Sequence, residues 1–142
     1  MKMVLDSSVL AKLFFKEEGS DSAIELMEKG DLHDLEFISS DLVVFEIGNT
    51  IYRNLKGKKK DGRRYIELVF LLNIDLIPID HTIAKEAMVQ AQKYSITFYD
   101  GVHVALSKLN DAILVTQNKE LLKKIRSSRS IDAVMEGIEK LD

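Results

Sequence analysis

The sequence predicts an α/β domain with a central, mostly parallel sheet flanked by helices. Short apolar runs of strand length alternate with longer segments whose apolar residues recur at helical spacing, and Asp or Asn often stands where one gives way to the other. With 142 residues and 46% hydrophobic composition, the chain can build a sizeable core as one domain spanning residues 1–142. Right-handed crossovers place the carboxyl ends of parallel strands along one edge, where we expect ligands to bind.

The first half of the chain carries two predicted strands and four predicted helices. The run at residues 2–5 is short and apolar, as in a buried strand. After it, Val9, Leu10, Leu13 and Phe14 recur at helical spacing. The predicted strands here are residues 2–5 and 36–40, and the predicted helices are residues 8–15, 20–29, 41–55 and 65–73.

The second half continues the alternation. Its only proline, Pro78, places one strand at an edge of the sheet or at a strand end. We expect Asp80, Asp100 and Asn118 to cap three helices, because their side chains can accept hydrogen bonds from first-turn N–H groups. The predicted strands are residues 76–80 and 112–116, the predicted helices are residues 80–94, 99–110 and 118–125, and residues 130–141 are predicted to pass from strand to helix.

Composition excludes several classes of protein. The absence of cysteine removes disulfides and thiolate metal sites, which fits an intracellular protein. No signal peptide and no apolar run of about 18–20 residues is present, so we expect a cytoplasmic protein without a membrane segment. The net charge of −3 gives no global attraction for nucleic acid, although basic residues gather in "RNLKGKKKDGRR" (53–64) and "KKIRSSR" (123–129). Each run is either a solvated loop or a local contact patch.

The carboxylates admit two interpretations. An aspartate at a strand–helix junction, such as Asp6, is ordinarily an N-cap. Several carboxylates in one pocket repel one another, unless a hard cation such as Mg²⁺ binds between them. Glu46 shares the polar face of its predicted helix with Asn49 and Arg53, so periodicity alone favours a solvated side chain.

Other chemistries find little support. The chain has no HExxH, GxGxxG, GxxxxGK[ST] or GxSxG motif, which argues against the zinc, nucleotide and serine-nucleophile sites that use them. An aspartyl-phosphate enzyme would need a second acid close to Asp6, where Ser8 stands instead. His103 follows Asp100 by one helical turn and is either a packing residue or a support for a site there.

Four segments together carry a resemblance to a known family. They are "VLDSSVLAKLF", "DLVVFEIGNTIYR", "TFYDGVHVALS" and "ILVTQNKELL". Their order and spacing resemble the PIN-domain family, in particular the VapC-type ribonuclease toxins of type II toxin–antitoxin systems. The resemblance covers essentially the whole chain and implies a single PIN-like domain.

The resemblance also implies roles for individual residues, and it turns Glu46 toward an acidic pocket. One residue departs from the family's pattern: the fourth acid is replaced by Asn118, which contributes no charge, so a second metal ion has weaker support. The implied catalytic residues are Asp6, Glu46, Asp100 and Asn118; the implied metal ligands are Asp6 and Asp100; and the implied supporting residues are Ser8, Asn49 and Thr116.

The activity implied by the resemblance is hydrolysis of RNA phosphodiester bonds with Mg²⁺ or Mn²⁺. The implied partners are the RNA substrate, a small cognate antitoxin and a second copy in a homodimer, or a larger hetero-oligomer with the antitoxin. An RNA-processing PIN nuclease without an antitoxin and a catalytically weakened PIN-fold binding module remain alternatives. The basic residues expected to contact RNA or a partner are Lys56, Lys58, Lys59, Lys60, Arg63 and Arg64.

Overall fold

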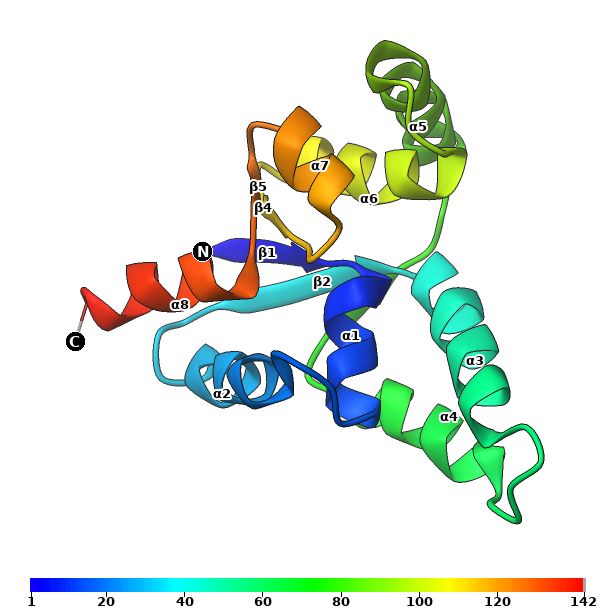
Figure 1. Ribbon diagram of the computed structural model, residues 1–142. Helices are drawn as coiled ribbons and strands as arrows, with labels where there is room; N and C mark the ends of the chain where they lie inside the picture. The colour runs from blue at the N-terminus through cyan, green and yellow to red at the C-terminus, as the bar shows by residue number, and fades with distance from the viewer. Residues whose placement is uncertain (142) are drawn as a thin grey trace.

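The computed structural model describes residues 1–141, which form a five-stranded sheet between two layers of helices (Figure 1). The strand order is β3-β2-β1-β4-β5, and every neighbouring pair is parallel, which confirms the predicted α/β class. The strands are β1 (Lys2–Leu5), β2 (Glu36–Ser40), β3 (Asp75–Ile77), β4 (Ile113–Val115) and β5 (Ser128–Arg129).

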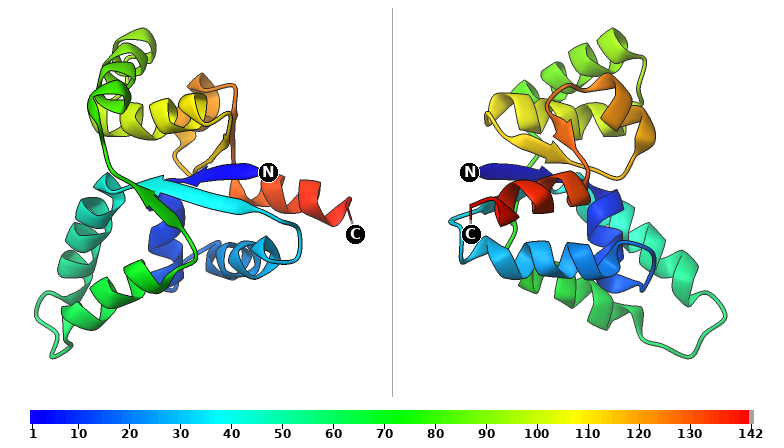
Figure 2. Two further views of the ribbon diagram at one scale, coloured as in Figure 1. Left: turned by 180° about the vertical axis from the view of Figure 1, so that it is seen from behind. Right: turned by 60° about the vertical axis from the view of Figure 1, so that its left-hand side comes forward.

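The helices divide between the two faces of the sheet. Helices α5, α6 and α7 cover one face, and α1 to α4 and α8 cover the other (Figures 1 and 2). Their bounds are α1 (Ser7–Phe14), α2 (Ser20–Gly30), α3 (Leu42–Leu55), α4 (Gly62–Leu71), α5 (His81–Tyr94), α6 (Phe98–Leu109), α7 (Lys119–Lys124) and α8 (Ile131–Glu139).

Strand β1 lies at the centre of the sheet and is buried on both sides. Met3 and Leu5 pack into the core beneath α1, α2 and α3, whereas Val4 packs into the core beneath α5 and α6. A central parallel strand covered by helices on both faces reads as a continuous apolar run, because neither side of its pleat meets water. This is the pattern of residues 2–5.

The order of the strands reverses beside β1. From β1 the chain adds β2 and β3 outward on one side, and then returns to place β4 and β5 on the other. Adjacent crossovers therefore leave in opposite directions between β1 and β4, which opens a crevice at the carboxyl ends of these strands. Asp6 directly follows β1, and Thr116 directly follows β4.

One predicted cap and one predicted helix start are wrong. Helix α6 begins at Phe98, within one residue of the predicted start, but its N-cap is Thr97 and not Asp100. The Thr97 side chain accepts a hydrogen bond from the Asp100 backbone N–H (3.1 Å), because Thr97 is also a capping residue and lies one turn earlier. Helix α4 begins at Gly62, three residues before the predicted start, because the Asp61 side chain caps it.

Other predicted boundaries are confirmed to within a few residues. Strand β3 is an edge strand that ends directly before Pro78, as the proline predicts. Asp80 and Asn118 are the N-caps of α5 and α7. The helical hairpin of α3 and α4 extends away from the sheet, with the loop of residues 56–61 at its tip (Figure 2). Within residues 1–141, no helix is both long and apolar enough to span a bilayer.

Candidate active site

Asp6 lies at the carboxyl end of β1 and is held by several donors. Its side chain is almost fully buried, with 4% of the residue exposed. One carboxylate oxygen, Oδ1, accepts hydrogen bonds from the backbone N–H groups of Ser8 (3.0 Å) and Val9 (3.3 Å) and from the Ser8 hydroxyl (2.5 Å). The other, Oδ2, accepts one from the Thr116 hydroxyl. Asp6 therefore caps α1, as its position predicts, and is also fixed from β4.

Ser8 and Thr116 tie the two strand ends together. Ser8 Oγ accepts a hydrogen bond from the Gln117 backbone N–H (2.9 Å), and Thr116 Oγ1 accepts one from the Asn118 backbone N–H (3.0 Å). Each hydroxyl thus binds the Asp6 carboxylate and the turn after β4 at once. A buried network with its groups satisfied in this way holds a carboxylate in one orientation.

Asn118 stands at the same edge of the sheet. Its Oδ1 accepts hydrogen bonds from the backbone N–H groups of Glu120 (2.9 Å) and Leu121 (3.3 Å), which makes it the N-cap of α7. An aspartate could cap with one carboxylate oxygen and coordinate a cation with the other. In Asn118 the second position is an amide NH₂, which donates and cannot coordinate a cation.

Asp100 lies in the first turn of α6, half-buried and without a capping role of its own. Burial raises the pKa of the Asp100 carboxyl, and the charges of Asp6 and Glu46 raise it further, against the opposing effects of His103 and Thr97. Asp6, Glu46 and Asp100, which come from β1–α1, α3 and α6, therefore lie within electrostatic range of one another.

Glu46 projects from α3 toward α6, where its Oε1 lies 2.8 Å from Nε2 of His103. The Glu46 side chain is 25% exposed, while His103 is buried, with 1% exposed. Burial on its own lowers the pKa of His103, but the hydrogen bond with Glu46 and the charges of Asp6 and Asp100 outweigh it, so the pKa lies above its ordinary value.

His103 is the residue of this site that sequence reasoning did not select. Its other ring nitrogen, Nδ1, is buried and has no hydrogen-bond partner among residues 1–141. The available signal was its spacing, one helical turn after Asp100, which places both side chains on one face of α6. That spacing cannot show that the face meets Glu46 of a distant helix.

Two groups of predicted residues remain: Asn49 on α3, and the basic residues that follow the end of α3. Asn49 lies on α3 one turn after Glu46 and is exposed. The basic residues between 56 and 64 are all exposed and lie at the tip of the α3–α4 hairpin, away from the carboxylates (Figure 1). Among them, Arg63 forms an ion pair with Asp61 (2.9 Å).

The site offers oxygen ligands, although no three Asp, Glu or His side chains within residues 1–141 are drawn together as a ready metal site. Mg²⁺ commonly binds to one or two carboxylates and keeps several waters. Asp6 and Asp100 are candidates for such a pair. Burial first, and then the charges of Asp6 and Glu46, raise the pKa of Asp100, and a bound cation would offset both effects. The donor set therefore fits one hard divalent cation.

Carboxylates near the point where the strand order of a parallel sheet reverses are typical of α/β proteins that bind a charged ligand at that edge. Within this class, the chain belongs to the PIN domain family, whose pattern matches residues 3–127.

The chain is similar to several characterised or solved members. It is 28% identical to Ribonuclease VapC3 of Pyrobaculum aerophilum over 129 residues, covering 87% of this chain and 95% of the relative. The crystal structure of PAE2754 from the same organism superposes with a TM-score of 0.71 at 21% identity, covering 99% of this chain and 96% of that one. VapBC2 from Rickettsia felis, solved bound to a promoter DNA fragment, gives a TM-score of 0.71 at 18% identity, covering 92% and 98%.

Proposed function

We propose that this protein is a metal-dependent endoribonuclease and the toxin of a VapBC-type toxin–antitoxin pair. The observation that carries the proposal is the cluster of Asp6, Glu46 and Asp100 at the switch point of a PIN domain. The similarity to a protein named as a ribonuclease, over nearly its whole length, supports RNA as the substrate.

Asp6 and Asp100 would hold one Mg²⁺ or Mn²⁺ ion. When bound, such a cation neutralises the phosphate and lowers the pKa of water near it. Asp6 is suited to this role because four donors fix its carboxylate before any ligand arrives. Ser8 and Thr116 serve as positioning residues, since they orient Asp6 through their hydroxyl groups.

Glu46 would receive the proton of the attacking water. Its Oε1 is engaged by His103, which leaves Oε2 to face the water. The water oxygen bonds to phosphorus as the bond to the 3′ oxygen breaks, Glu46 takes the proton, and the leaving oxygen is protonated from solvent. The product strand then carries a 5′ phosphate. Asn118 contributes to this site chiefly by capping α7, and Asn49 is a candidate supporting residue one turn after Glu46 on α3.

The matched pair Asp6→Asn and Asp80→Asn tests this function. Both residues are N-cap aspartates and asparagine keeps the capping oxygen, so both variants should fold. Asp6→Asn also replaces the oxygen that accepts from the Thr116 hydroxyl by an amide that donates, so its thermal unfolding is measured beside its activity. Incubated with structured RNA and Mn²⁺, Asp6→Asn should cleave about 100-fold more slowly or worse, because it loses a ligand charge. Asp80→Asn should cleave like the wild type. Equal cleavage by all three proteins would refute a metal-dependent nuclease site at Asp6.

An antitoxin is the partner this proposal requires, and its support is the VapBC2 complex among the similar structures. A groove between α3 and α4 offers an apolar floor of Ile51, Leu55 and Ile66, with Lys56 and Lys60 at its edge. Exposed aromatic residues of α3 extend this surface. The groove is our candidate for the antitoxin or for a second copy in a homodimer, and Lys58, Lys59, Arg63 and Arg64 are further candidates for RNA or partner contacts.

The partner can be tested by coexpression with the product of a small adjoining reading frame. Copurification and loss of cleavage in the complex would support the toxin. Cleavage without any such partner would support an RNA-processing PIN nuclease. A weakened PIN-fold binding module is favoured by one observation, the amide of Asn118 in place of an acid, and RNA binding without cleavage would support it.

A further inference from the structure

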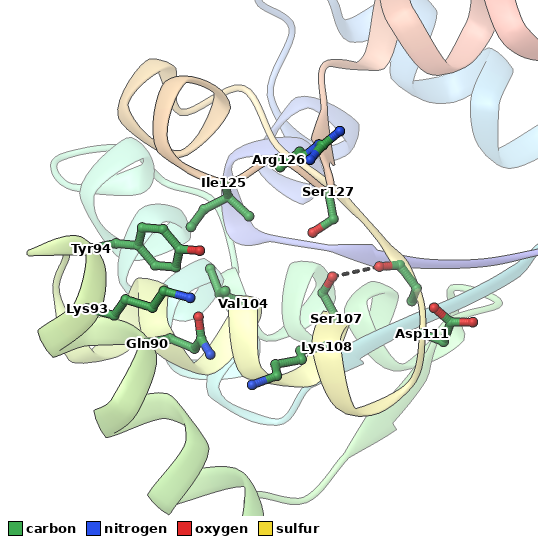
Figure 3. Close-up of a pocket in the computed structure, with 11 residues that line it drawn as sticks. Gln90, Lys93, Tyr94, Val104, Ser107, Lys108, Asp111, Ile125, Arg126 and Ser127 are labelled. Carbon is green, nitrogen blue, oxygen red and sulfur yellow. Dashed lines mark hydrogen bonds between the residues drawn. The ribbon is translucent and has the colours of Figure 1, made fainter.

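A separate pocket lies at the opposite end of α6 from the carboxylates (Figure 3). It has a volume of about 420 Å³ and is lined by the last turns of α5 and α6 and by the segment joining α7 to β5. Lys108 on its wall follows Asp100 by eight positions, which is about 12 Å along the helix. The pocket therefore sits at the amino ends of β4 and β5 and does not belong to the candidate active site. We call it the α5–α6 pocket.

Positive charge prevails around the α5–α6 pocket, although the whole chain is acidic. Lys93, Lys108 and Arg126 line it, against the single carboxylate of Asp111. Lys108 is paired with Glu86 (2.6 Å), and Lys93 also acts on that carboxylate from a longer distance and lies over the Tyr94 ring (5.1 Å). Within residues 1–141, neither Lys93 nor Arg126 forms an ion pair. Arg126 belongs to the second basic run of the sequence (123–129), and none of the residues of that run is part of the candidate active site.

The pocket also combines neutral hydrogen-bonding groups with an apolar floor. Gln90 is buried, with 4% exposed, and its Nε2 donates to Glu86 (2.7 Å), which fixes the carboxamide and leaves its oxygen available. Figure 3 shows this carboxamide near the Lys93 ammonium and the Tyr94 hydroxyl at one end of the pocket. The floor is formed by buried side chains, among them Val104 and Ile125.

We propose that the α5–α6 pocket binds one nucleotide. Lys93 binds the phosphate; Val104 and Ile125 support the flat face of the base; and the Gln90 oxygen accepts a hydrogen bond from the nucleotide. Arg126, at the opposite rim, adds positive charge at longer range. A site with a few convergent polar groups over an apolar floor and a cavity of this size suits a ligand of that class, and the Lys93 ammonium favours a phosphate. The nucleotide is either free or part of an RNA strand, and the site does not depend on cleavage.

The test titrates AMP and UMP into the full chain and follows the methyl NMR signals of Val104 and Ile125 with calorimetry. Both nucleotides, or one of them, should shift these methyls, and the corresponding nucleosides should bind about tenfold more weakly. Lys93→Gln should weaken binding about tenfold. Lys16→Gln makes the same charge change at an exposed position far from the pocket and should have no effect.

A second variant, which changes no charge, distinguishes binding in the cavity from a general effect of the protein's charge on nucleotide affinity. Ser127 is exposed and lines the pocket, so Ser127→Phe should fill the cavity without unfolding the protein and should abolish binding. A parallel titration uses single-stranded RNA and the Asp6→Asn protein, which avoids cleavage. Methyl shifts with RNA alone, weakened by Lys93→Gln, would assign the site to a nucleotide of a bound strand.

The proposal is overturned if neither mononucleotides nor RNA shift the two methyls, if Lys93→Gln and Ser127→Phe bind as tightly as the wild type, or if inorganic phosphate binds as well as the nucleotides. None of these results would bear on cleavage at Asp6.

Discussion

Asp100 carries its charge half-buried and within reach of Asp6 and Glu46. Its carboxyl pKa is raised in the folded protein, so any stability from this group is present at pH below its unfolded value and is lost as pH rises through the folded value. At neutral pH the ionised group therefore opposes folding. Such a cost is usual where a site is shaped for a ligand and not for stability.

Replacing Asp100 by asparagine should therefore stabilise the metal-free protein at neutral pH. We expect the melting temperature to rise by about 3 °C, as about 1 kcal/mol produces in a domain of this size. Asp132→Asn, at an exposed first-turn position of α8, should slightly lower it, because a negative charge there favours the helix N-terminus. Calorimetry with a chelator measures both, and a lower melting temperature for Asp100→Asn would contradict the electrostatic argument.

The His103–Glu46 pair predicts a pH dependence of the same sign, but in this case because attraction stabilises the charged form of His103. Because the folded-state pKa of His103 is raised, its contribution to stability is complete below the unfolded value of about 6.5 and is lost as pH rises through the folded value. The free energy of unfolding of metal-free protein should thus decline above about pH 6.5, by up to about 1.4 kcal/mol for each pH unit.

Urea unfolding at several pH values, with a chelator, measures this slope. His103→Gln should flatten it, since glutamine still donates to Glu46 but does not titrate. His81→Gln, at the exposed first position of α5, should keep the wild-type slope. A slope unchanged in His103→Gln would assign the pH dependence to another group.

Helix α6 can carry two site residues because it packs closely against both α5 and the sheet. The closest approach is at Gly101, where an added Cβ would lie 2.5 Å from the Ala87 carbonyl oxygen of α5. Only glycine allows the two backbones this separation. The contact lies directly beside Asp100 and therefore sets the position of its side chain.

Gly101→Ala should destabilise the protein by about 1–3 kcal/mol, the usual cost of overpacking, and should lower cleavage through displacement of Asp100. Gly137→Ala in α8 is the matched control, because an added Cβ there meets nothing within 4 Å. That variant should gain about 0.5–1 kcal/mol from helix propensity. Denaturant unfolding of the two variants gives both values, and equal stability would show that α5 and α6 can move apart without cost.

At the level of the whole molecule, the proposed function links cation binding to folding, because residues as far apart in the chain as Asp6 and Asp100 come near each other only when it is folded. A cation at about 100 times its dissociation constant should stabilise the protein by about 2.7 kcal/mol. Asn118→Asp keeps the cap of α7 and adds a charged oxygen, so it should raise the affinity for Mn²⁺ about tenfold.

Thermal unfolding over a series of Mn²⁺ concentrations tests this linkage. Asp6→Asn should remove the stabilisation, and Asn118→Asp should reach it at lower Mn²⁺. If Asn118→Asp and the wild type respond alike, the residue at position 118 caps α7 and plays no part in binding the cation.

The sequence by itself determined four of the five strands, the helices and most of their boundaries. It missed β5, which lies at Ser128–Arg129, before the residues 130–141 that were expected to contain a strand and are instead the cap and body of α8. Periodicity and capping are local properties, so residues 2–5, 36–40 and 41–55 could be assigned to their elements without knowledge of their neighbours. Capping was misassigned at Asp100, because Thr97 caps the helix one turn earlier and accepts a hydrogen bond from the Asp100 N–H. The alternation of elements also predicted that Asp6 and Asn118 would share one edge.

Only the tertiary packing of the helices and strands decided which side chains of the candidate site lie together. Periodicity placed Glu46 on the polar face of its helix, and only the position of α6 across from α3 gives that face a buried partner in His103. The use of both Asp6 oxygens likewise depends on a threonine 110 positions away. The α5–α6 pocket joins residues of two helices and of the loops that follow α6 and α7. Such contacts join residues far apart in the chain, and the spacing of residues within one element carries no information about which other element it will face.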